Sequence, residues 1–348
     1  MRQKIIVDGD GGGDEAQLMA VLLARPEKFE VLGATAVHGN THHDQVVENF
    51  GSILRMFRLD RRIPYFPGAK TELGKEHTLE GDGAHGDNGL GRATPEKARY
   101  PSKKQQTADF ILQTLRDNPP GTVTITATGP LSNIAQALHD DPKTLAKAKE
   151  IVIMGGCIRQ MPAHDMDFRQ GNIHPKTEFN FHMAAADAKA VMQSGIAPMT
   201  LFPLDCTQQM EFTPKRELWM RRALRGANPD VVEDLVKMMK APEWLDKMKF
   251  NKHAFMHDIH TAMYLEEGEL YRGRFQEVTI NDGQVKETRG MSTGSYRLGA
   301  MNPANTKHNV LVMEDILDPD RVFSKLIDSY KRLLLPKVPL YPTPDFVH

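Results

Sequence analysis

The sequence predicts an α/β protein with an open, mostly parallel, Rossmann-like sheet and helices on both faces. Three observations predict this class. Strand-like apolar runs alternate with amphipathic stretches through the first two thirds of the chain. Each run is almost entirely apolar, as expected for strands that are covered on both sides. Polar, glycine-containing segments follow several runs, and ligands of such folds bind beyond the carboxyl ends of the strands.

The strands and helices follow from hydrophobic spacing. The predicted strands are 4–7, 30–37, 122–128, 150–154 and 199–204. The predicted helices between and after them are 14–24, 43–57, 106–116, 131–138 and 184–193. Because every strand but the last is followed by a helix that can cross back over the sheet, neighbouring strands are expected to run parallel.

The last third of the chain changes character. Residues 212–252 are helical in pattern and charged, which predicts either a helical cap over the pocket or a surface helical pair. Residues 275–298 predict a small β-hairpin, with Asn281-Asp282-Gly283 as its turn signal. Residues 318–335 predict a closing helix, and 336–348 form a proline-rich tail. No internal repeat or linker interrupts residues 1–348, so we expect one domain.

Composition excludes several classes of function. Lys and Arg total 44 against 45 Asp and Glu, so the net charge of −1 gives no basic surface for nucleic acid or membranes. No run of about 18 apolar residues is present to cross a bilayer. The two cysteines, Cys157 and Cys206, fit small apolar filler at buried strand ends better than a disulfide framework. The first strand begins too early to leave room for a signal peptide, so a cytoplasmic location is expected.

The most informative segment is an acidic, glycine-rich loop after the first strand. Residues 8–15 hold Asp8, Asp10, Asp14 and Glu15 together with four glycines. Four like charges at one strand end repel one another unless a cation or a positively charged substrate lies among them. Oxygen ligands on a tight turn suit a hard divalent ion, chiefly Ca²⁺ or Mg²⁺. A metal-dependent enzyme is therefore the first hypothesis.

Two known kinds of acidic loop fit this segment less well. An EF-hand requires oxygen ligands at its fifth position and a glutamate at its twelfth, where this chain has Gly12 and Met19, so the EF-hand is excluded. A haloacid-dehalogenase-type phosphatase also begins with strand-Asp-x-Asp-Gly, but it carries a hydroxyl residue where Gly12 and Gly13 stand. A solvated acidic turn is the remaining structural alternative, although such turns rarely place carboxylates against a buried strand.

Two further groups of polar residues are candidates for substrate binding, catalysis or metal ligation. Asn172, Glu178 and Asn180 precede an alanine-rich helix and offer donors and acceptors that suit the hydroxyls of a sugar, although Asn180 equally fits a helix N-cap. The pair His257-Asp258 opens a helix. Such a pair is usually a surface feature, but here His257 could act as an acid and Asp258 as a further metal ligand.

Taken in order, these segments resemble the motifs of the inosine–uridine-type nucleoside hydrolase family over nearly the whole chain. Each motif is modest alone, and eight in the same order are specific. The matching motifs are 8–16, Gly39-Asn40, 85–91, 128–133, 154–156, 178–180, 204–207 and His257-Asp258. The chain departs from the family pattern at Gly11, which replaces a proline and is expected to loosen the turn, at Glu15, which replaces an aspartate, and at Ala184-Ala185, which replace Asp-Pro.

The resemblance implies a role for each site residue. It implies that Ca²⁺ is held by Asp10, Glu15, Asp258 and the backbone carbonyl of Thr128, with Asp8 nearby. It implies that Asp10 is the general base. It assigns the ribose 2′ and 3′ hydroxyls to Asp14, Asn180 and Asp258, the 5′ hydroxyl to Asn172 and Glu178, the reacting carbon to Asn40, the leaving-group acid to His257 and the base-side loop to His85.

The prediction is therefore a Ca²⁺-dependent enzyme that hydrolyses a ribonucleoside to ribose and a free base, and the resemblance also implies a homo-oligomer, dimer or tetramer. Two alternatives stay open: hydrolysis of an unusual nucleoside, and a non-catalytic ribose- or nucleoside-binding protein. The preferred base depends on segments 73–95 and 212–257. Residues available there to stack or donate include Trp219, Trp244, Phe250, Phe255 and several histidines.

Overall fold

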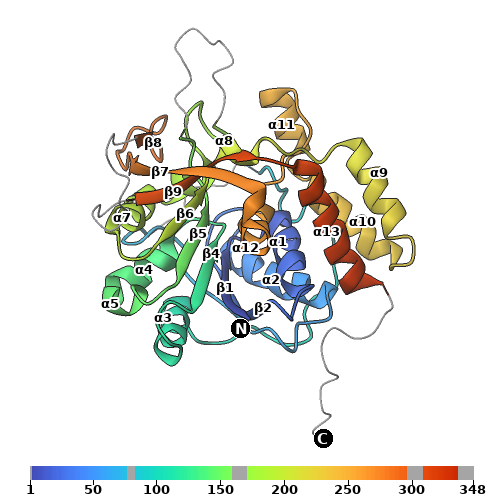
Figure 1. Cartoon of the computed structure of the whole chain (residues 1–348), viewed down its shortest axis with the longest axis horizontal. Coiled ribbons are helices and arrows are strands. Elements are labelled where there is room, and N and C mark those ends of the chain that lie inside the picture. The colour runs from blue at the N-terminus through green and yellow to red at the C-terminus, as the bar shows by residue number, and fades with distance from the viewer. Residues whose placement is uncertain (1, 77–82, 159–170, 296–308, 336–348) are drawn as a thin grey trace, which may run out of the picture.

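The computed structural model describes residues 2–76, 83–158, 171–295 and 309–335 (Figure 1). Its centre is a nine-stranded sheet with strand order β3-β2-β1-β4-β5-β6-β9-β7-β8. The strands are β1 (Gln3–Gly9), β2 (Phe29–Ala36), β3 (Tyr65–Phe66), β4 (Val123–Ala127), β5 (Glu150–Met154), β6 (Met199–Phe202), β7 (Tyr271–Ile280), β8 (Ser292–Ser295) and β9 (Asn309–Ile316). Strands β1 to β6 and β9 pair in parallel, while β7 pairs antiparallel with β8 and β9. The predicted mostly parallel α/β sheet is confirmed.

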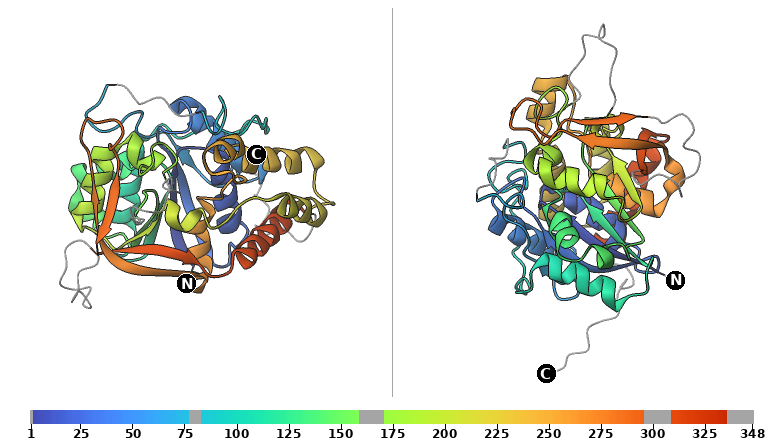
Figure 2. Two further views of the ribbon diagram at one scale, coloured as in Figure 1. Left: turned by 90° about the horizontal axis from the view of Figure 1, so that it is seen from above. Right: turned by 90° about the vertical axis from the view of Figure 1, so that its left-hand side faces the viewer.

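Helices cover both faces of this sheet (Figures 1 and 2). One face carries α3 (Thr107–Asp117), α4 (Ser132–Asp140), α5 (Pro142–Leu145) and α7 (Ala185–Ser194). The other carries α1 (Gly13–Leu23), α2 (His43–Met56), α12 (Ile259–Glu266) and α13 (Pro319–Leu334). The remaining elements are α6 (Phe179–Met183), α8 (Leu204–Thr207), α9 (Pro214–Ala223), α10 (Pro229–Lys240), α11 (Glu243–Phe250) and the 3₁₀ turn η1 (Gly268–Leu270).

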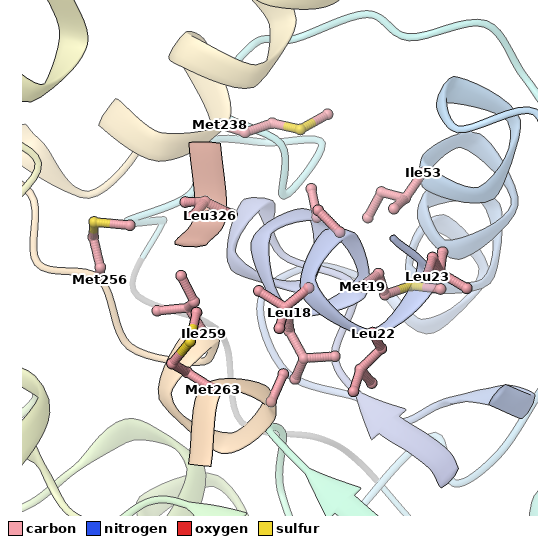
Figure 3. Packing of buried hydrophobic residues seen from close by; sticks show 14 of the residues in the cluster. Leu18, Met19, Leu22, Leu23, Ile53, Met238, Met256, Ile259, Met263 and Leu326 are labelled. Carbon is pink, nitrogen blue, oxygen red and sulfur yellow. The ribbon is translucent and has the colours of Figure 1, made fainter. Parts of the chain in front are cut away.

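Helix α1 is buried along its whole length, which fixes the acidic loop that precedes it. Its apolar side chains pack among those of α2, α10, α12 and α13 (Figure 3). The residues labelled there are Leu18, Met19, Leu22, Leu23, Ile53, Met238, Met256, Ile259, Met263 and Leu326. A fully buried helix of 11 residues has an apolar surface on every side, which explains why its sequence shows no polar face after the first turn.

Residues 212–252 form three helices, α9 to α11, rather than a pair. Helix α10 packs against α1, and the start of α11 contributes Pro242, Leu245 and Asp246 to the pocket described below. The segment is therefore partly core and partly pocket wall.

The predicted hairpin at 275–298 is confirmed only in part. Strands β7 and β8 do pair antiparallel, but β7 begins at Tyr271 and also pairs with β9, so the hairpin belongs to the main sheet. The predicted tight turn at Asn281-Asp282-Gly283 is wrong, because residues 281–291 all separate the two strands. The side chain of Asn281 instead accepts the N–H of Gly283. Residues 296–298 and the proline-rich tail at 336–348 lie outside the described residues.

Both cysteines are buried, as predicted for filler, and neither is joined in a disulfide. Cys157 follows β5, whereas Cys206 lies within α8 and not at a strand end. Within the described ranges, no helix is both long and apolar enough to cross a membrane.

Candidate active site

A pocket opens at the carboxyl edge of the sheet, beyond β1, β2, β4 and β5. The space between its walls, including the open solvent at its mouth, is about 580 Å³. Its lining residues are Asp10, Asp14, Asn40, Ala84, His85, Thr128, Met154, Asn172, Glu178, Phe179, Asn180, Pro242, Leu245, Asp246, His257 and Asp258. Segments far apart in the chain thus meet in one place, and ten of the predicted site residues line it.

The acidic loop is held by its glycines and by α2. Gly11 has a φ of +63°, a left-handed conformation that proline cannot adopt because its ring fixes φ near −65°. The carbonyl of Gly11 accepts a hydrogen bond of 2.8 Å from Asn49 Nδ2. The glycine permits a conformation that a hydrogen bond from α2 then holds, and the expected loosening of the turn at Gly11 stays a prediction.

Asp10 and Asn40 form one unit in the pocket wall. The Asp10 carboxylate accepts hydrogen bonds from Asn40 Nδ2 at 2.8 Å and from Asn40 N at 3.1 Å. Burial raises the pKa of Asp10 well above its usual range, and the charges of Glu15 and Asp14 raise it further. Asn40, predicted to lie near the reacting carbon, thus orients the Asp10 carboxylate while lining the pocket itself.

Gly39 allows this contact, because a Cβ there would overlap the Asp10 carboxylate and lie 2.6 Å from its Cβ. We expect Gly39→Ala to displace Asp10 and to lower kcat by roughly 10- to 100-fold, the order of a misplaced catalytic group. Gly268→Ala is the matched control, since a Cβ at Gly268 meets no atom closer than 3.6 Å. Steady-state kinetics of both variants check this, and equal activity of the two would contradict it.

Asp8 and Glu15 lie behind the pocket wall. Asp8 Oδ1 accepts from Thr35 Oγ1 at 2.6 Å and Asn133 Nδ2 at 2.7 Å. Glu15 accepts from the Thr128 hydroxyl at 3.3 Å. Burial raises the pKa of Asp8 to about 7 and that of Glu15 to about 8, the latter with a contribution from the charge of Asp14. Among the described residues, Asp8 Oδ2 and Glu15 Oε2 are buried oxygens without a hydrogen-bond partner.

Asp14 and Asp258 complete the acidic cluster. Burial raises the pKa of Asp14, although the charge of His85 and the backbone N–H of His257 oppose the shift. Burial also raises the pKa of Asp258 well above its usual range, and the charges of Glu15, Asp14 and Asp10 follow as further causes. Asp258 therefore lies within electrostatic reach of the amino-terminal loop, as the sequence predicts. Over the described ranges, no three His, Cys, Asp or Glu side chains are already arranged around a metal position.

The second part of the pocket is polar and includes Asn172, Glu178 and Asn180. Glu178 caps α6, with its carboxylate accepting the N–H groups of Gly156 at 2.8 Å, Asn180 at 2.8 Å and Phe181 at 3.1 Å. The predicted N-cap role of Asn180 is therefore wrong, because the extended backbone at Glu178 lets its longer side chain reach those amides. Burial raises the pKa of Glu178 to about 7.

Asn180 instead contacts two strand ends. Its Nδ2 donates to the carbonyls of Thr128 and Met154, both at 3.1 Å. The Thr128 carbonyl, predicted as a metal ligand, thus already accepts one hydrogen bond and keeps its second lone pair. Asn172 Oδ1 accepts the N–H of Phe179 at 2.9 Å. These contacts fix the carbonyl and amide groups that line this side of the pocket.

His257 and His85 form the third part of the pocket. Burial lowers the pKa of His257 to about 3, and the charge of His85 contributes. Nδ1 of His257 lies 2.7 Å from the hydroxyl of Thr207. Nδ1 of His85 is buried without a hydrogen-bond partner among the described residues.

None of the four aromatic residues that the sequence offers for stacking lines this pocket. Trp219 packs on Phe323 with ring centroids 5.3 Å apart, and Trp244 is half exposed with its Nε1 donating to the Ala84 carbonyl at 3.3 Å. Sequence reasoning instead missed Phe179, Leu245 and Asp246, which do line it. Phe179 lies within the motif 178–180, but a helical pattern alone gives no sign that Leu245 and Asp246 face a pocket.

The parallel sheet and the acidic pocket at its carboxyl edge define an α/β enzyme architecture. Residues 5–324 match the family model described as inosine-uridine preferring nucleoside hydrolase, so the chain belongs to that family. It is an enzyme that hydrolyses the N-glycosidic bond of nucleosides.

Individual relatives agree. The chain is 32% identical over 323 residues to the pyrimidine-specific ribonucleoside hydrolase RihA of Salmonella arizonae, covering 91% of this chain and 94% of the relative. The purine-preferring ribonucleoside hydrolase of Gardnerella vaginalis superposes with a TM-score of 0.81 at 22% identity, over 95% of this chain and 99% of that one, which shows the shared fold. An inosine-guanosine nucleoside hydrolase superposes with a TM-score of 0.78 at 25% identity, over 94% and 98% of the two chains.

Proposed function

We propose that this enzyme is a Ca²⁺-dependent ribonucleoside hydrolase that releases ribose and a free purine or pyrimidine base. The observation that carries the proposal is the meeting of Asp10, Asp14 and Asp258 at one pocket, with Glu15 buried behind its wall. Each of these carboxyl groups is buried and has a raised pKa. Such a cluster ionises fully only when a cation offsets the mutual repulsion.

The residues present fit a hard divalent ion. The donors are all oxygens, and the unpartnered oxygens Asp8 Oδ2 and Glu15 Oε2 are buried within the same cluster. The ion would be held by Asp10, Glu15, Asp258 and the Thr128 carbonyl. Asp8 would lie nearby. A bound ion of this kind lowers the pKa of coordinated water.

Asp10 is proposed as the general base. Two hydrogen bonds from Asn40 fix its carboxylate in the pocket wall, so a proton acceptor is positioned before substrate arrives. Asp14, Asn180 and Asp258 are proposed to bind the 2′ and 3′ hydroxyls of ribose, and Asn172 and Glu178 the 5′ hydroxyl. The surrounding carboxylates also stabilise the positive charge that develops on the ring during bond cleavage.

The proposal is tested by measuring reducing sugar released from purine, pyrimidine and modified nucleosides, with Ca²⁺ and with a chelator. We expect release from at least one ribonucleoside, its loss on chelation and its return with Ca²⁺. Activity that persists after complete removal of bound metal would contradict the metal dependence. The same panel identifies the preferred base and separates common from unusual nucleosides.

His257 and His85 are proposed to serve the leaving base, with His257 as the donor. We expect His257→Ala to lower kcat on purine nucleosides by roughly 10²- to 10⁴-fold, the range of general acid catalysis. Turnover of an aryl riboside with an activated leaving group should fall far less, because that group departs without a proton. Steady-state kinetics on both substrates check this, and equal losses would remove the donor role.

A further inference from the structure

Thr207 contacts His257 from behind the pocket. Its hydroxyl lies 2.7 Å from Nδ1 of His257, although the two residues are 50 positions apart. Thr207 ends α8, which directly follows β6, and its exposed fraction is 0%. It does not line the pocket, whereas His257 does. Thr207 therefore reaches a pocket residue without touching the pocket itself.

His257 lines the pocket together with Asp14 and Asp258, which places the residue beside the acidic cluster. The hydroxyl of Thr207 holds Nδ1. Because Nδ1 faces the protein interior, Nε2 is the ring nitrogen that remains for a ligand in the pocket.

Proton counting gives the direction of this hydrogen bond. In the part of the chain that the structure describes, Nδ1 of His257 is the hydrogen-bond partner of the Thr207 hydroxyl. The carbonyl of Pro203, one turn back, already accepts the backbone N–H groups of Cys206 at 2.9 Å and Thr207 at 3.1 Å. If Nδ1 carried a proton, the hydroxyl hydrogen would be buried without an acceptor, which is unfavourable. The hydroxyl therefore donates to Nδ1.

We propose that Thr207 is a positioning residue that keeps the ring proton of His257 on Nε2, directed at the leaving base. This inference rests on the proposed function, in which His257 serves the base. A ring with the other tautomer, or flipped about its Cβ–Cγ bond, would present a lone pair or a carbon to the base. Charge accumulates on a ring nitrogen or carbonyl oxygen of the base as the glycosidic bond breaks, and a fixed N–H donor stabilises it there.

Kinetics of Thr207→Val test the proposal, because valine keeps the shape and removes the hydroxyl. We expect kcat on a nucleoside to fall roughly 10- to 100-fold with KM changed less than about 3-fold, and kcat on an activated aryl riboside to change less than about 3-fold. Thr207→Ser retains the hydroxyl and should recover most of the nucleoside activity. Equal losses on the two substrates, or no recovery with serine, would overturn the proposal.

A matched control and a double variant separate positioning from packing. Thr124 is also fully buried, but its hydroxyl has no hydrogen-bond partner among the described residues. Thr124→Val should therefore leave both activities unchanged. If Thr207 acts through His257, Thr207→Val should add no further loss to His257→Ala on the nucleoside. Additive losses would place the effect of Thr207 elsewhere.

The tautomer is measured directly in the intact enzyme by NMR of ¹⁵N-labelled histidine. We expect His257 to show a protonated Nε2 and an unprotonated Nδ1, and Thr207→Val to shift population toward the opposite tautomer. A protonated Nδ1 in the wild-type enzyme would overturn the proposal even if every variant were active. This measurement needs no turnover, so it also decides the Thr207 contact if no nucleoside proves to be a substrate.

Discussion

Replacing Asp10 by asparagine is expected to lower kcat on nucleosides by roughly 10²- to 10⁴-fold, the range found when a general base is removed. The variant keeps the size and shape of the side chain but loses the charge and the basicity. Asparagine also retains one carbonyl oxygen to accept from Asn40, which now donates to both carboxylate oxygens. The fold should therefore survive, and steady-state kinetics together with a thermal unfolding curve check both parts.

A control distinguishes this effect from a general loss of negative charge. Asp109 is exposed in the first turn of α3 and does not line the pocket, so Asp109→Asn should leave kcat unchanged. Metal content must be measured in the same preparations, since Asp10 is also a proposed ligand. A variant that keeps its metal and loses turnover supports the base assignment, and near-normal turnover would refute it.

The strands that position Asp10 are predictable because each is a continuous apolar run. The observed β1, β2, β4, β5 and β6 fall within two residues of the predicted limits at every end. Parallel strands are buried on both faces, so their composition alone identifies them. Strand β9 is not among the predicted strands, and neither is its pairing with β7, because strand pairing between distant segments leaves no local signal.

The active site, like the fold, is predictable from the sequence only in part. The motifs predict that Asp10, Asp14 and Asp258 meet, and the structure brings them to one pocket. The sequence does not predict the cap of α6 or the contact between Thr207 and His257. Both depend on which amide or ring nitrogen a side chain reaches in three dimensions, and spacing along the chain does not determine that.

Removing the divalent ion is expected to make the free energy of unfolding depend on pH between about 6.5 and 8, with stability falling as pH rises. Burial raises the pKa of Asp8 to about 7 and that of Glu15 to about 8. Without a cation, these carboxyl groups bind protons in the folded state at pH values where the unfolded chain, with pKa values near 4, does not. Raising the pH toward the folded-state pKa therefore favours unfolding.

The lower limit of this window comes from the buried histidines. Burial lowers the pKa of His257 to about 3 and that of His38 to about 4. Because these histidines are neutral in the folded protein, the free energy of unfolding rises with pH. The rise ends at the histidine pKa of the unfolded chain, about 6.5. Above that value the carboxyl groups act alone. Each one that is still protonated in the folded state contributes a loss of about 1.4 kcal/mol per pH unit.

Calcium should abolish this slope, because a bound cation lets the carboxylates ionise in the folded protein and stabilises it by preferential binding. Urea unfolding at pH 6.5 and 8, in Ca²⁺ and in chelator, measures the difference. In chelator, Glu15→Gln should reduce the slope, since glutamine cannot titrate and fills the same space beside Thr128. Identical slopes with and without Ca²⁺ would mean that the ion does not bind among these carboxylates, and a reduced slope with Mg²⁺ alone would assign the site to the smaller ion.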